Sequence, residues 1–218
     1  MLPLVPWSSR VNAEEYERFT REQPLYRALN ERLVALARVG EARRVLDLAC
    51  GTGATALACL EVLPADGEVV GVDASPAMVE VARAVVADPR ARFLVAPASR
   101  VERVVAGPFD RVLSNAAFGQ FPASRPVIGA AARLLAPGGL FAFNLAGEQI
   151  TGAGGAPHPF QVALAGGVGG GGRATPPTIA AGDLLAVLAE EGFAPVARER
   201  FVYRGRQGEL VELMELPA

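Results

Sequence analysis

The sequence predicts a single α/β domain built around a mostly parallel β-sheet. Short apolar segments alternate with segments of helical periodicity from residue 44 to residue 145. Strands that are separated by helices imply right-handed crossovers, and therefore parallel neighbours in the sheet. The chain has 218 residues, of which 51% are hydrophobic, so it is long and apolar enough for one domain with a sizeable core.

The expected elements follow from local patterns. Residues 12–38 form one or two amphipathic helices, because Leu25, Leu29 and Leu33 recur at helical spacing and Pro24 suits a first turn. Ser75 before Pro76 is an N-cap signature that opens a further helix. Strands are expected at 44–48, 68–72, 92–95, 111–114 and 140–145, and the helices between them at 55–63, 76–86 and 126–135, the last of which stops at Pro137-Gly138-Gly139.

The alternation breaks after residue 145. Residues 152–172 contain nine glycines, which predicts a flexible insertion or a lid over residues 147–178. A helix over 178–191 follows, and then two strands at 195–203 and 208–216 that a short turn makes antiparallel. The expected organisation is a helical cap (1–40), a cofactor-binding core (41–146), the insertion (147–178), and a closing helix and hairpin (179–218).

Charge and cysteine content restrict the partners and the compartment. The formal net charge is -2, and no stretch concentrates basic residues as a nucleic-acid surface would. Cys50 and Cys59 fit neither a disulfide framework nor a metal-ligand spacing, which suits a reducing cytosol. Without a signal peptide or an apolar span in the sequence, we expect a cytoplasmic protein that is not bound to a membrane. A single histidine and few clustered acids predict that there is no metal site.

The strongest motif lies where the first strand meets the first core helix. Gly51 and Gly53 permit a sharp turn that a ligand can approach closely. Asp73, which is 22 residues after Gly51 at the end of the second strand, can accept hydrogen bonds from a ribose. These features fit any nucleoside, including a nicotinamide dinucleotide. Asp47 favours a positively charged ligand, because it would repel a pyrophosphate; otherwise Asp47 is a helix N-terminal acid and Asp73 a turn residue.

Four segments resemble motifs of the class I S-adenosylmethionine-dependent methyltransferases: residues 45–53, 70–78, 107–115 and 134–139. The resemblance implies a three-layer Rossmann-like fold whose seven-stranded sheet has the order 3-2-1-4-5-7-6, and S-adenosylmethionine as the cofactor. It further implies that the cofactor is bound by Asp47, Ala49, Gly51, Gly53, Asp73, Ala74, Met78, Ala98, Ser99 and Asn115. The segment after the third strand lacks the usual acid for the adenine, and Ser99 is the proposed substitute.

Two residues are candidates for catalysis, each with a simpler alternative. His158 is either a general base or a solvated loop residue. Tyr16 either closes over the cofactor, as the resemblance implies, or is a core aromatic.

The methyl acceptor is expected to be a small apolar or aromatic molecule, for example a quinone-like one, because aromatic residues flank the expected pocket. These residues are Trp7, Tyr16, Phe19, Phe118, Phe121 and Phe160. The remaining rivals are an NAD(P)-dependent oxidoreductase, a protein that binds S-adenosylmethionine without catalysis, and one that uses the bound sulfonium to steer a cyclisation.

Overall fold

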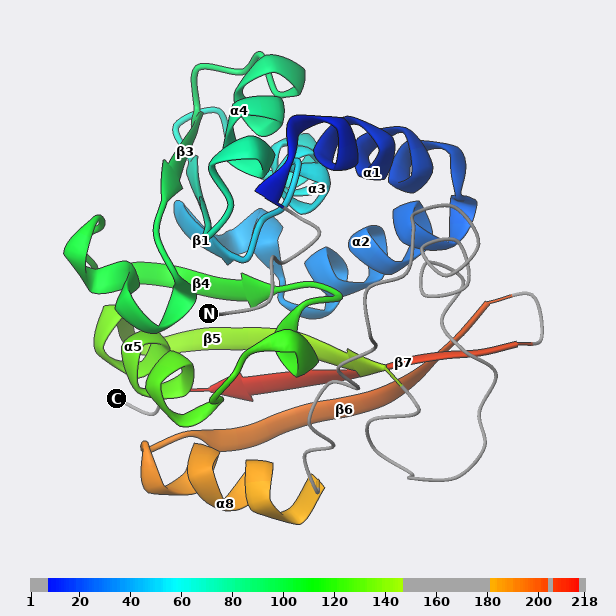
Figure 1. Ribbon diagram of the computed structural model, residues 1–218. Coiled ribbons are helices and arrows are strands. Elements are labelled where there is room, and N and C mark those ends of the chain that lie inside the picture. The colour runs from blue at the N-terminus through cyan, green and yellow to red at the C-terminus, as the bar shows by residue number, and fades with distance from the viewer. Residues whose placement is uncertain (1–7, 147–180, 204–205, 216–218) are drawn as a thin grey trace.

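The computed structural model describes residues 8–146, 181–203 and 206–215. One sheet runs through the molecule in the order β3-β2-β1-β4-β5-β7-β6 (Figure 1). Its strands are β1 (Arg44–Leu48), β2 (Glu68–Asp73), β3 (Ala91–Val95), β4 (Phe109–Ser114), β5 (Leu135–Ala146), β6 (Ala194–Tyr203) and β7 (Arg206–Glu215). The pairs among β1 to β5 are parallel, and β7 pairs antiparallel with β5 and β6. The Rossmann-like α/β architecture with a mostly parallel sheet is therefore confirmed.

Helices cover both faces of the sheet (Figure 1). On one face, α2 (Pro24–Leu36), α3 (Ala54–Val62) and α4 (Pro76–Val85) contribute to a core that includes Leu33 and Val45. On the other face, α5 (Arg125–Leu134) and α8 (Ala181–Glu190) contribute to a core that includes Ile128 and Phe143. Two buried cores on either side of one sheet make up three layers.

Local signals in the sequence account for several element boundaries. Ser75 caps α4 by accepting a hydrogen bond from the Met78 N–H, and Pro76 is its first residue. Pro24 likewise opens α2, which Gln23 separates from α1 (Arg10–Glu22). Of the one or two helices predicted over residues 12–38, the structure shows two, with a break before the proline because proline lacks the N–H of a helix interior.

The transition from α5 to β5 differs from the expectation. The helix ends at Leu134, and Leu135 already pairs with Phe109 of β4. The register then shifts before Leu140 pairs with Arg111. Because Pro137 favours an extended conformation in the residue before it, the Pro-Gly-Gly segment belongs to an irregular start of β5 and is not a loop after the helix.

The first helix, α1, lies across the end of α4 and not on the sheet. Ala13 of α1 is fully buried and forms a small apolar cluster with Ala77, Met78 and Val81 of α4, against which Tyr16 packs. This contact holds α1 above the region where β1 and β2 end. Within the part of the chain that the structure describes, no helix is long and apolar enough to cross a membrane.

Candidate functional site

The turn after β1 has the backbone conformation that its glycines permit. Gly51 and Gly53 have φ values of +53° and +91°, in the left-handed region. A Cβ on Gly53 would lie 2.8 Å from Cγ2 of Val86, and a Cβ on Gly51 would lie 3.4 Å from Cε1 of Tyr16. Any larger side chain at Gly51 would therefore fill the space between the turn and α1.

Two alanines beside this turn adopt the same unfavourable conformation. Ala49 has a φ of 56°, and Ala116, just after β4, has a φ of 53°. Such a conformation costs an L-residue with a Cβ about 1–2 kcal/mol. Strained residues of this kind cluster at functional sites, and both alanines line the same pocket.

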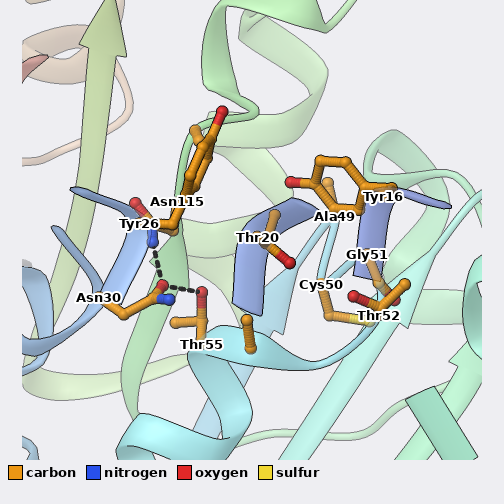
Figure 2. Close-up of a pocket in the computed structure, with 12 residues that line it drawn as sticks. Tyr16, Thr20, Tyr26, Asn30, Ala49, Cys50, Gly51, Thr52, Thr55 and Asn115 are labelled. Atoms are coloured by element: carbon orange, nitrogen blue, oxygen red, sulfur yellow. Dashed lines mark hydrogen bonds between the residues drawn. The ribbon is translucent and has the colours of Figure 1, made fainter. Parts of the chain in front are cut away.

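The pocket lies between the Gly-rich turn, α1, α2 and the segment after β4 (Figure 2). Its lining consists of Tyr16, Thr20, Tyr26, Asn30, Ala49, Cys50, Gly51, Thr52, Ala54, Thr55, Asn115 and Ala116. None of these twelve residues is Lys, Arg, His, Asp or Glu. Four of the predicted site residues are brought together here, namely Tyr16, Ala49, Gly51 and Asn115.

Asp47 is buried in the middle of the sheet. It is 1% exposed, and its neighbours in register are Gly71 of β2 and Leu113 of β4. Neither carboxyl oxygen has a hydrogen-bond partner among the described residues. Burial, reinforced by the charge of Asp73, raises the pKa of Asp47 to about 8. The alternative that Asp47 is a helix N-terminal acid is wrong, since it belongs to β1 and α3 begins at Ala54.

Asp73 ends β2 and is held by backbone donors. Its Oδ1 accepts a hydrogen bond from the Ser75 N–H at 2.8 Å, and its Oδ2 accepts one from the Gly51 N–H at 3.0 Å. Burial raises the pKa of this carboxyl, and the backbone N–H groups oppose the shift. Asp73 therefore links the two turns that follow β1 and β2, and it is also the turn residue that the simpler alternative foresaw.

The other predicted residues have diverse surroundings. Met78 is 3% exposed and lies in the apolar cluster under α1, close to Tyr16. Ala98 is buried, whereas Ala74 and Ser99 are exposed. Ser99 lies in a short 3-10 segment (η3, Ala98–Arg103) after β3.

Cys50 is buried, and burial raises the pKa of its thiol well above the usual value, as expected for an apolar filler.

The assignment of Phe118 to the acceptor pocket is wrong. Its ring is fully buried and stacks on Phe143 with a centroid distance of 4.2 Å, in the core beside α5. Phe121 is partly buried and packs edge-on against Phe118. Phe19 packs edge-on against Tyr26 on the other side of the sheet. The candidates Trp7, His158 and Phe160 lie outside the described residues.

Eight of the twelve lining residues were not among the predicted site residues: Thr20, Tyr26, Asn30, Cys50, Thr52, Ala54, Thr55 and Ala116. Asn30 left a weak signal, because it is a polar residue on the face of α2 that also carries the buried Tyr26 and Val34 at helical spacing. A polar side chain on such a face needs a partner in the interior. That partner is Thr55, whose hydroxyl donates a hydrogen bond to Asn30 Oδ1 at 2.9 Å.

Comparison with known proteins finds similarity to methyltransferases. Residues 45–139 match the family model described as a methyltransferase domain. Demethylmenaquinone methyltransferase of Thermus thermophilus is 40% identical over 110 residues, which are 50% of this chain and 49% of that protein. The match therefore spans about half the length of this curated relative.

Solved structures share the fold over nearly the whole chain. A chain in the complex of the Haloferax volcanii Trm112 methyltransferase activator with a methyltransferase has a TM-score of 0.70 and 17% identity, and the match covers 96% of this chain and 97% of that one. Magnesium protoporphyrin IX methyltransferase from Synechocystis, solved with bound S-adenosylhomocysteine, has a TM-score of 0.61 and 17% identity over 87% of this chain and 83% of its own. At this identity the two structures support the fold.

Proposed function

We propose that the chain, of which residues 45–139 match a methyltransferase domain, is a class I S-adenosylmethionine-dependent methyltransferase that transfers a methyl group from S-adenosylmethionine to a small acceptor that has an apolar or aromatic part. The observation that supports this proposal is Asp47, whose buried carboxyl group precedes the Gly-rich turn and has no partner for either oxygen among the residues that the structure describes. A buried carboxylate without a partner is costly. A ligand with an ammonium and a sulfonium would supply the missing positive charge.

The residues around the turn fit the rest of this cofactor. Ala49 and Gly51 line the pocket where its amino-acid end would lie, Gly53 permits the turn that presents them, and Asp73 is close enough to the turn to accept hydrogen bonds from its ribose. Met78 offers an apolar surface beside Tyr16. Asn115 lines the same pocket from the segment after β4.

When bound, the cofactor supplies a methyl group that its positive sulfur already activates. The protein then contributes alignment and exclusion of water. Tyr16 from α1 and Tyr26 from α2 line the pocket (Figure 2), so both N-terminal helices contribute to its wall. The twelve described lining residues offer no carboxylate or imidazole as a general base, which favours an acceptor that is already nucleophilic or one that His158 deprotonates.

An acceptor with an aromatic ring is supported by the two tyrosines and by the Thermus relative, whose name specifies demethylmenaquinone. Demethylmenaquinone is therefore the first acceptor to test. A protein or nucleic-acid acceptor is less favoured, since the net charge is -2 and the lining of the pocket carries no basic residue.

Thermal melts separate the proposal from its main rival, an NAD(P)-dependent oxidoreductase. A ligand present at about a hundredfold its Kd should stabilise the protein by ~2.7 kcal/mol. We expect stabilisation by S-adenosylmethionine and S-adenosylhomocysteine and none by NAD. Stabilisation by NAD alone would refute the proposal.

Transfer itself is tested with S-adenosylmethionine that carries a tritiated methyl group. Extraction of tritium into the lipid-soluble fraction in the presence of reduced demethylmenaquinone is the expected result. Cofactor binding without transfer to any member of an acceptor panel would favour the non-catalytic alternative.

A further inference from the structure

The side-chain amides of Asn144, Asn115 and Asn30 are joined by hydrogen bonds into a row that begins in β5 and ends in the pocket. The Ala116 N–H donates a hydrogen bond to Asn144 Oδ1 at 2.5 Å. Asn144 Nδ2 donates to Asn115 Oδ1, and Asn115 Nδ2 donates to Asn30 Oδ1. The Oδ1 of Asn30 also accepts the hydrogen bond from Thr55 Oγ1 (Figure 2). The row therefore joins β5, the segment after β4, α2 and α3.

The orientation of all three amide groups follows from the hydrogen bond between the Ala116 N–H and Asn144, at the buried end of the row. A backbone N–H can only donate, so Asn144 must present its oxygen to Ala116 and its NH₂ group to Asn115. Asn115 must then present its oxygen to Asn144 and its NH₂ group to Asn30. As a consequence, the oxygen of Asn30 is occupied and its Nδ2 is the free end of the row.

Nδ2 of Asn30 makes no hydrogen bond to any described residue, although Asn30 is only 6% exposed and lines the pocket. The unpartnered atoms that are completely sealed from solvent in the described chain are the two oxygens of Asp47 and Ser114 Oγ. Asn30 Nδ2 is not one of them, so it reaches the open space of the pocket. An N–H donor that faces the pocket from a residue that is otherwise buried is therefore available to an acceptor atom of a ligand, in place of water.

The position of Asn30 indicates which ligand atom that is. It lies beside Thr55 in the first turn of α3, where free backbone N–H groups and the helix dipole favour an anion. Asp73, where the ribose is expected, is on the opposite side of the Gly-rich turn, toward β2. An extended cofactor anchored at Asp73 therefore directs its amino-acid end into the pocket of Asn30.

We propose that Asn30 is a cofactor-binding residue that donates a hydrogen bond from Nδ2 to the carboxylate of S-adenosylmethionine, at the N-terminus of α3. This inference rests on the proposed function, because it takes S-adenosylmethionine as the ligand. No sequence motif points to Asn30, and no lysine or arginine lines the described pocket to take the carboxylate instead.

The test compares two ligands that differ only in the carboxylate: S-adenosylhomocysteine and its decarboxylated analogue. In Asn30→Asp, Oδ1 still accepts from Thr55 and Asn115, but an oxygen replaces the donor that faces the pocket. We expect the affinity for S-adenosylhomocysteine to fall about 10- to 100-fold, as for the loss of a hydrogen bond to a charged group. The affinity for the decarboxylated analogue should change less than about threefold. Both affinities are measured by isothermal titration calorimetry.

Asn30→Ala is the second variant. Because a general loosening of the pocket would weaken the binding of both ligands equally, the ratio of the two affinity losses isolates the contribution of the carboxylate. Glu31→Gln is the matched control, since Glu31 is the next residue of α2 and pairs only with Arg27 on the surface. An equal loss for both ligands in both Asn30 variants would overturn the inference and leave Asn30 a structural role. Unchanged affinity for both ligands would also overturn it. Failure of the wild-type protein to bind S-adenosylhomocysteine at all would instead refute the proposed function, and the inference with it.

Discussion

The strands β1 and β2 each carry an aspartate near the carboxyl end, and the two carboxyl groups differ in their hydrogen bonding. Asp73 in β2 accepts hydrogen bonds from the backbone N–H groups of Gly51 and Ser75. Asp47 in β1 is more deeply buried and has no partner for either oxygen in the described chain. The carboxyl group at the end of β2 is therefore paired within the described residues, whereas the carboxyl group at the end of β1 is not.

This difference separates two kinds of contribution to one site. Asp73 connects the two turns in the free protein, and in the proposed function it also binds the ribose. Asp47 lowers the stability of the free protein, because its carboxyl group is removed from water without a partner among the described residues, and in the proposed function a bound cation would offset that cost. Variants at the two positions should thus have opposite effects on stability, although both weaken binding.

The largest effect is expected from Asp47→Asn, which keeps the shape and removes the charge. The affinity for S-adenosylmethionine should fall by about 3–5 kcal/mol, as for a buried ion pair that loses one partner. The free energy of unfolding of the ligand-free protein should stay the same or rise. Calorimetry and urea denaturation measure the two quantities, and a clear loss of stability in the ligand-free variant would contradict the comparison.

Asp73→Ala should lower both quantities. Loss of the acceptor for Gly51 and Ser75 should reduce the free energy of unfolding by about 1–3 kcal/mol, and loss of the acceptor for the ribose should weaken cofactor binding by a similar amount. Asp66→Ala is the control, because its side chain is 69% exposed. Unchanged affinity in Asp73→Ala would remove Asp73 from the binding site.

The pH dependence of stability provides a third measurement. The pKa of Asp47 is about 8 in the folded protein and about 4 in the unfolded chain. Between these values the folded state binds more protons, so this group makes the ligand-free protein less stable as the pH rises from about 4 to about 8. The slope from one such group is at most about 1.4 kcal/mol per pH unit. Denaturation midpoints at several pH values should show a shallower decline in Asp47→Asn than in the wild type, and identical slopes would show that Asp47 is not the group responsible.

The smallest effect is expected where α1 meets the turn after β1. Thr52 Oγ1 donates a hydrogen bond to Glu17 Oε2 at 2.9 Å, and Thr52 is 1% exposed. Thr52→Val should destabilise the docking of α1 by about 1 kcal/mol. Faster hydrogen exchange confined to α1, with unchanged exchange in β1 and β2, is the expected readout. Exchange that rises throughout the sheet would mean that this contact belongs to the core.

The order of elements was predictable because local residues specify it. The Ser75-Pro76 pair and Pro24 define helix starts, and the apolar strands β1 to β5 lie within a few residues of their expected positions. Asp47, Gly51 and Asp73 were identifiable since their spacing along the chain reflects one strand-turn-helix unit. The start of β5 at Leu135 was not identifiable, because it depends on pairing with β4.

Neither the amide row nor the position of Phe118 could be predicted from the sequence. Asn30, Asn115 and Asn144 meet only after α2, β4 and β5 are assembled, and contacts between residues 85 and 29 positions apart leave no local pattern. Phe118 follows β4 as a pocket residue would, but its ring turns into the phenylalanine cluster around Phe141 and Phe143. Phe118 lies in the core and not in the pocket because of packing against residues that are distant in the sequence or on other elements.

Asn144 shows how a residue outside the lining of a pocket can influence which groups the pocket presents. It is 1% exposed and belongs to β5, yet the orientation of its amide sets that of Asn115 and, through Asn115, that of Asn30. Substitution of Asn144 by a residue that cannot accept from Ala116 would free the two remaining amides to turn over. The pocket would then present a carbonyl oxygen where it now presents an N–H, and its preference would change from anions toward cations without any alteration of its lining residues.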